Sequence, residues 1–166
     1  MLEPEEYLKK ARESQRIADH QAYVTYRFVK DPKFLAAIVE HIDQGFDYGM
    51  NAILSYEAGY KRIHFPLDRK QREELFKGYT AKKEVSLKKY LPVIREVHAC
   101  FLKCKESPVT FQRKEKLVLC DEKYSMDLLS IESIKNQIRL MNDFIRNVET
   151  ILVRNERLNK RSQKEE

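Results

Sequence analysis

The amino-acid sequence predicts a mainly all-α protein: an antiparallel bundle of four or five helices with a small β-hairpin inserted before the last helix. Three observations indicate this class. The 166 residues include only four glycines and five prolines, and 35% of them are charged, which is typical of helical proteins. Apolar residues recur at spacings of three and four along most of the chain. Residues 108–121 are instead rich in β-forming side chains.

A chain of this length fits one domain, which we place at residues 1–158, followed by a frayed C-terminal tail at residues 159–166. The three cysteines form no CxxC pair, which favours reduced thiols over a disulfide framework. No apolar run approaches the ~20 residues of a membrane span, and the acidic N-terminus does not resemble a signal peptide. We therefore expect a cytoplasmic protein that does not bind membranes.

The first two helices are separated by Lys30-Asp31-Pro32. Pro4 suits the first position of the first helix, and Asp31 is expected to cap the second helix with Pro32 at its first position. The second helix, from Phe34 to about Tyr60, contains three glycines that each cost about 1 kcal/mol relative to alanine. These glycines, Gly45, Gly49 and Gly59, predict a close helix crossing; the alternative is a pocket beside a glycine.

The later elements begin with a third helix that Asp68 is expected to cap. A fourth helix is predicted over Ser86–Lys105, and a hairpin over Val109–Arg113 and Leu117–Cys120 with a three-residue loop. The last helix, Ile131–Leu158, has a continuous apolar stripe at helical spacing: Ile131, Ile134, Ile138, Met141, Ile145, Val148 and Leu152. We expect this stripe to pack on the glycine-bearing second helix, with a dimer contact as a secondary use of a second apolar flank formed by Leu140, Phe144 and Ile151.

No motif in the sequence indicates catalysis or a cofactor. Cys100 and Cys104 share a helical face, but His98 points away from them, so a metal site is not predicted. Asp43 and Asp47 lie four residues apart on one face. They are interpreted as a solvated acidic face, the alternative being a cation site or a carboxyl with a raised pKa. We therefore predict no catalytic residue, metal ligand or cofactor.

Residues 61–89 hold ten basic and four acidic side chains, interleaved with aromatic residues. Phosphate contacts and base stacking are both chemically available to such a segment, although an ordinary charged helix surface has the same composition. The candidate nucleic-acid-binding residues are Lys61, Arg62, Arg69, Lys70, Arg72, Lys77, Lys82 and Lys83.

Two stretches suggest a family. Residues 7–14, YLKKARES, look like the opening helix of the HEPN superfamily of prokaryotic helical bundles, and the alanine- and tyrosine-bearing helix from Phe34 to Tyr56 resembles its second helix. Active members are ribonucleases with an Arg and a His four to six residues apart on a late helix. This chain departs from that pattern, because its last helix contains no histidine. The resemblance implies a non-catalytic relative that binds RNA, a nucleotide or a protein, and no catalytic residue carries over.

The sequence therefore predicts a small, non-enzymatic, intracellular binding or scaffold protein, which forms a homodimer through its long helices. The alternative is a HEPN-like RNA-binding protein, with or without nuclease activity from a non-standard site.

Overall fold

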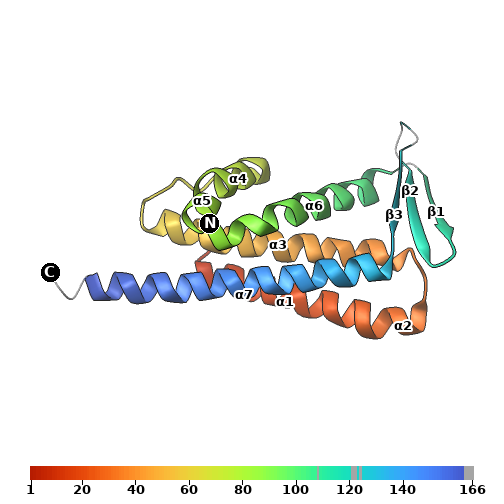
Figure 1. The fold of residues 1–166 in the computed structure, drawn as a ribbon, viewed down its shortest axis with the longest axis horizontal. Coiled ribbons are helices and arrows are strands. Elements are labelled where there is room, and N and C mark those ends of the chain that lie inside the picture. The colour runs from red at the N-terminus through yellow and green to blue at the C-terminus, as the bar shows by residue number, and fades with distance from the viewer. Residues whose placement is uncertain (108, 121–122, 124, 163–166) are drawn as a thin grey trace.

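A computed structural model describes residues 1–107, 109–120, 123 and 125–162. These residues form five helical segments and a three-stranded antiparallel sheet just before the last helix (Figure 1). The α-helices are α1 (Pro4–His20), α2 (Tyr26–Val29), α3 (Phe34–Gly59), α4 (Arg69–Leu75), α5 (Ala81–Lys83), α6 (Leu91–Glu106) and α7 (Ile131–Ser162), and the strands are β1 (Val109–Arg113), β2 (Lys116–Cys120) and β3 (Met126–Leu129). The predicted mainly helical class is confirmed.

Irregular turns join some of these helices into longer segments. A π-helical turn at Gln21–Thr25 connects α1 to α2, and another at Phe76–Thr80 connects α4 to α5. A 3-10 turn at Val85–Tyr90 precedes α6, so the fourth helix was predicted to begin too early. Pro92 explains the difference, because proline is tolerated only in the first turn of an α-helix.

The predicted caps are correct at two helices and differ at a third. Pro4 begins α1, and the Asp68 carboxylate accepts a hydrogen bond from the Gln71 backbone at the start of α4. Asp31 does not cap α3 directly, because its carboxylate accepts from the Lys33 backbone in a turn that precedes the helix. Lys30, with φ 49°, takes the left-handed conformation that ends α2.

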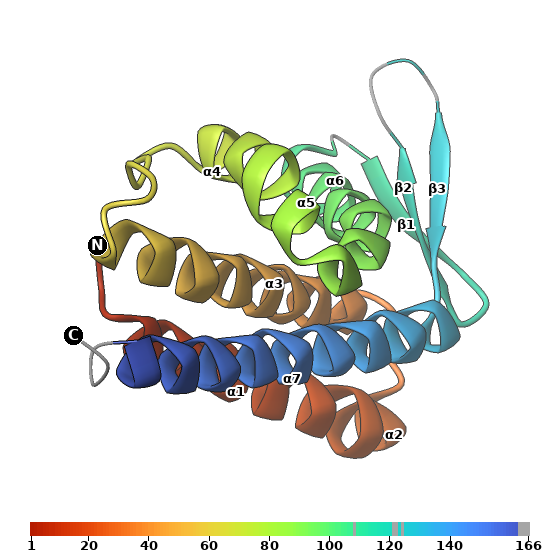
Figure 2. The same ribbon diagram turned by 60° about the vertical axis from the view of Figure 1, so that its left-hand side comes forward.

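The core lies around α3, which is buried along most of its length. Helices α1 and α7 run along one side of α3, and α4, α5 and α6 lie along the other (Figures 1 and 2). The apolar stripe predicted for the last helix faces this core, and α7 packs on α3 as expected. Phe144 and Ile151 of the second flank are buried in the same core, so the prediction that this flank is available for a dimer contact is wrong. Both layers of helices therefore pack against α3.

Two of the three glycines of α3 lie at the crossing with α7. Gly45 faces the side chain of Met141, and a Cβ added to Gly49 would lie 2.7 Å from Cε1 of Phe144. Nothing lies within 4 Å of the corresponding position at Gly59. The prediction of close packing is confirmed for Gly45 and Gly49 and is wrong for Gly59, which lies at the exposed end of α3.

Alanine substitutions at Gly49 and at Gly59 should have opposite effects on stability. Gly49→Ala should lower the free energy of unfolding by about 1 kcal/mol, because overpacking against Phe144 outweighs the gain in helix propensity. Gly59→Ala should raise it by about 0.5 kcal/mol, because only the propensity gain applies there. Urea unfolding of both variants measures the two signs. Stabilisation by Gly49→Ala would contradict the close crossing.

The sheet is larger than the predicted hairpin. Strand β3 was missed, and it pairs antiparallel with β2, Val118 lying opposite Leu128. Because β2 begins at Lys116, the turn after β1 contains two residues rather than three, and Lys114 adopts a φ of 57° in it. Residues 108 and 121, the ends of the predicted hairpin, lie outside the described residues.

The last helix is longer than predicted. α7 continues past Leu158 to Ser162, where a frayed tail was expected, and the Asn159 side chain donates a hydrogen bond to the Tyr56 hydroxyl at 2.6 Å. This contact ties the final turns of α7 to α3. Residues 163–166 of the predicted tail lie outside the described residues.

Candidate functional site

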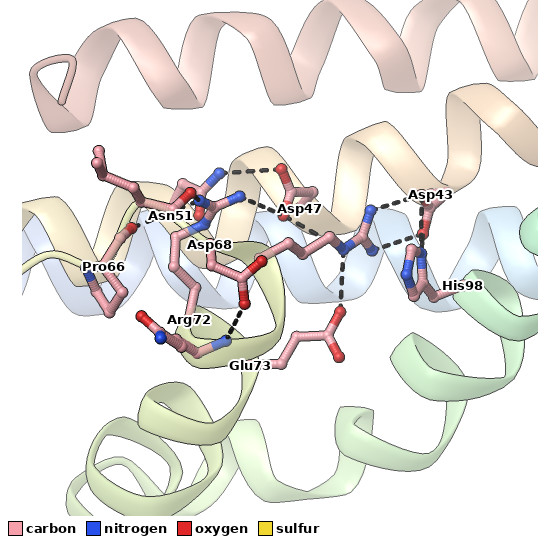
Figure 3. Close-up of polar contacts among 11 residues, drawn as sticks. Asp43, Asp47, Asn51, Pro66, Asp68, Arg72, Glu73 and His98 are labelled. Atoms are coloured by element: carbon pink, nitrogen blue, oxygen red, sulfur yellow. Dashed lines mark hydrogen bonds and ion pairs between the residues drawn. The ribbon is translucent and has the colours of Figure 1, made fainter.

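Side chains from two other helices, α4 and α6, converge on Asp43 of α3 (Figure 3). The Asp43 carboxylate is 2% exposed and accepts two hydrogen bonds from the Arg69 guanidinium of α4, each at 2.7 Å. Nδ1 of His98, on α6, lies 3.2 and 3.3 Å from the same two carboxylate oxygens. The negative charge of a buried carboxylate is best compensated by a guanidinium that donates two parallel hydrogen bonds to it. Asp43 therefore joins α4 and α6 to α3.

Asp47 lies one turn further along α3 and belongs to the same network (Figure 3). Its carboxylate accepts a hydrogen bond from the Asn51 side chain at 3.0 Å and lies 3.6 Å from Nε of Arg69 and 3.7 Å from Nη2 of Arg72. Arg69 also donates from Nε to Glu73 at 3.0 Å. The two arginines of α4 thus face a row of carboxylates.

Burial raises the pKa of Asp47 above its ordinary value of 3.8, and Asp43 adds to this effect, whereas Arg69, Arg72 and Asn51 oppose it. A carboxyl with a raised pKa binds its proton more tightly in the folded than in the unfolded protein. Folding is therefore favoured by protonation, and this contribution is lost as the pH rises from 3.8 through the raised pKa.

The variant Asp47→Asn removes this titration. Its stability relative to the wild type should therefore increase as the pH rises through the same window. Urea unfolding of both proteins at a series of pH values measures the difference. A difference that stays flat or declines with pH would show that burial does not dominate at Asp47.

A second buried carboxylate, Glu57, lies near the end of α3 and is also 2% exposed. Lys83 donates to its two oxygens at 2.8 and 3.0 Å, and the Tyr79 hydroxyl donates at 3.2 Å. Arg62 completes the set at 3.3 Å. This cluster ties the segment after α4 back to α3, as Asp43 does for α4 itself.

The eight predicted basic residues fall into two groups. Arg62, Arg69, Arg72 and Lys83 form ion pairs with carboxylates of α3. Lys61, Lys70, Lys77 and Lys82 are exposed, and no carboxylate in the described ranges pairs with them. Four of the eight residues therefore pair with carboxylates of α3, and the other four face solvent without such a partner.

The favoured interpretation of Asp43 as part of a solvated acidic face is wrong. Asp43 is buried, and burial raises the pKa of Asp47, in the direction that the alternative interpretation expects. Glu57 was not singled out at all. The available signal was its place after the apolar and small residues 50–56, which predicts a buried position.

Cys100 and Cys104 are both half-buried on α6. A hydrogen bond from the Cys100 thiol lowers the pKa of Cys104, and the same bond raises the pKa of Cys100. Among the residues that the structure describes, no three His, Cys, Asp or Glu side chains are placed to hold a metal ion. In the network around Asp43 and Asp47, the carboxylates and the arginines balance one another's charge, and their contacts join α3 to its neighbouring helices.

No family model, curated protein or solved structure matches this chain. Fold and site together define a mainly helical protein with a small sheet, whose interior is fastened by buried ion pairs. Within the described part of the chain, no helix has both the length and the hydrophobicity needed to cross a membrane.

Proposed function

We propose that this protein is a non-enzymatic scaffold whose helices form an antiparallel bundle. It self-associates through the exposed surface of α7 around Val153, which we call the α7 flank. The observation that carries the proposal is the position of Val153. This residue is 44% exposed and lines two adjoining surface pockets, one of about 310 Å³ between α1 and α7 and one of about 420 Å³ along α7.

The two pockets differ in charge: three carboxylates and two cations, Lys9 and Arg12, line the first, and one carboxylate and three cations line the second. Glu5 and Glu156 line the first and have no ion-pair partner among the described residues. Arg157 and Arg161 line the second, and no described carboxylate pairs with either of them. The first pocket therefore has a small excess of negative charge and the second an excess of positive charge.

Two-fold symmetry about Val153 would satisfy both pockets at once. In a symmetric dimer one surface meets itself, so the first pocket of one copy lies over the second pocket of the other. The acidic and basic residues then face each other twice, and the two Val153 side chains meet at the centre. This self-complementarity supports a homodimer in preference to a contact with an unrelated protein.

Light scattering tests the proposal. The wild type is expected to have the mass of a dimer, and Val153→Asp should give a monomer, because it places two carboxylates together at the centre of the interface. Leu67→Asp is the matched control, since Leu67 is 92% exposed in the loop before α4, and this variant should remain dimeric. A wild type that stays monomeric at high concentration would overturn the proposal.

RNA binding is the second candidate, and the exposed side chains of Lys61, Lys70, Lys77 and Lys82 favour it. Arg69 and Arg72 are unsuitable for testing it, because their substitution would disturb the network around Asp43 and Asp47. Neutralising Lys70, Lys77 and Lys82 together should reduce the slope of log affinity against log salt by about 2, at ~0.7 per single-strand phosphate contact. No retention of the wild type on RNA at low salt would exclude this function.

A further inference from the structure

One face of the three-stranded sheet exposes apolar side chains on its two edge strands, β1 and β3. Side chains alternate between the two faces of a strand, and Leu117, Leu119 and Leu129 point into the main core. The opposite face carries Phe111, Val118 and Leu128, which lie side by side across the three strands in the observed register.

Apolar surface is exposed on this outward face. Phe111 is 43% exposed and Leu128 57%, whereas Val118 between them is buried. Met126, two residues before Leu128 on the same face of β3, is 64% exposed. An apolar sheet face of this kind is normally covered by a helix.

Positive charge borders the apolar rows on one side. Arg113 and Lys116 are paired in register and lie on the same face, two residues along from Phe111 and Val118. Together with Lys114 they line a surface pocket of about 730 Å³ that also includes Leu128 and Glu132. Leu128 therefore belongs both to the exposed apolar surface of the sheet and to the pocket lined by the three cations.

We propose that this face binds an acidic amphipathic helix of a partner protein. The apolar stripe of that helix would cover Phe111, Leu128 and Met126, and its carboxylates would lie against Arg113, Lys114 and Lys116. Charge complementarity selects an acidic partner, because three cations border the face and Glu115 and Glu132 are the only carboxylates lining the pocket within the described residues. This surface is separate from the α7 flank, so the inference goes beyond the self-association proposed above.

The side chains favour a protein partner over a nucleic acid. Binding to single strands relies on aromatic rings that stack on the bases. Among the described residues this face has one such ring, Phe111, whereas Leu128 and Met126 offer aliphatic surface that bases do not use. An amphipathic helix uses both the aliphatic rows and the cationic border.

Fluorescence anisotropy with a labelled amphipathic helical peptide of leucine and glutamate tests the inference. The full-length protein should bind it, and should bind a peptide with lysine in place of glutamate at least about tenfold more weakly. Leu128→Ser and Arg113→Glu should each weaken binding by about tenfold. Val85→Ser, at a site that is 71% exposed and lies in the turn before α6, is the control and should bind as the wild type does.

Three outcomes would overturn the inference: equal binding of the two peptides, an unchanged affinity in Leu128→Ser, or displacement of the peptide by an oligouridylate. Loss of the dimer mass in Leu128→Ser would also overturn it, since this face would then bind a second copy. The Val153→Asp variant separates the two proposals, because it should still bind the peptide whether or not the wild type is a dimer.

Discussion

Replacement of Asp43 by alanine should lower the free energy of unfolding by about 3 kcal/mol, because breaking a buried ion pair from one side leaves the partner charge uncompensated. Arg69 loses a bidentate acceptor whose two bonds are both 2.7 Å long, and His98 loses its contact with the same carboxylate. Arg69 and His98 both lie on the side of α3 that is opposite to α1 and α7. The substitution therefore removes a contact to α3 from α4 and from α6 at the same time. Chemical unfolding followed by circular dichroism measures the change.

The matched control for this substitution is Asp143→Ala. Asp143 pairs with Arg146 at 2.8 Å, but the two side chains are 44% and 74% exposed, and pairs of this kind contribute at most about 0.5 kcal/mol. A double-mutant cycle adds a second check. Arg69→Ala should cost less in the Asp43→Ala background than in the wild type, and strictly additive losses would show that the two residues are not coupled.

Phe144→Ala should lower the free energy of unfolding by about 3–5 kcal/mol, the usual cost of truncating a fully buried aromatic ring. Phe144 is 0% exposed, and its ring centroid lies 5.3 Å from Tyr90, 5.5 Å from Phe46 and 6.0 Å from Phe76. These three rings come from three other segments of the chain. Loss of the Phe144 ring therefore opens a cavity where α3, α7 and the turns around α5 meet.

The control for Phe144→Ala is Phe28→Ala, which removes the same ring from a position that is 84% exposed. It should change stability by no more than about 0.5 kcal/mol. Thermal and urea unfolding of the two variants compare a buried ring with an exposed one of identical chemistry. A loss below about 1 kcal/mol for Phe144→Ala would contradict the proposed convergence of these segments.

Periodicity in the sequence was sufficient to predict the helices and the direction in which the last one packs. The stripe from Ile131 to Leu152 is regular, and its burial follows from local spacing alone. Strand β3 was missed because Met126–Leu129 is only four residues long, too short for alternation to separate it from a loop. Met126–Leu129 forms a strand because it pairs with β2, a contact that the local sequence does not reveal.

The charged network was not predictable in the same way. Asp43 and His98 are separated by 55 positions in the sequence, and Asp43 and Arg69 by 26, so no local pattern connects them. A row of carboxylates on a helix is usually solvated, and that expectation failed at Asp43 because α4 and α6 cover this part of α3. The basic residues of α4 were noticed, but their partners across the interface could be identified only from the fold.

Disulfide cross-linking at Val153 tests the central proposal, self-association through α7, most directly. In a protein whose three native cysteines are replaced by serine, Val153→Cys should form a covalent dimer on mild oxidation, because a residue on a two-fold axis meets its own copy. Arg146→Cys, about two turns away on the same helix, should not. Equal cross-linking at the two positions, or none at Val153, would contradict the proposed dimer.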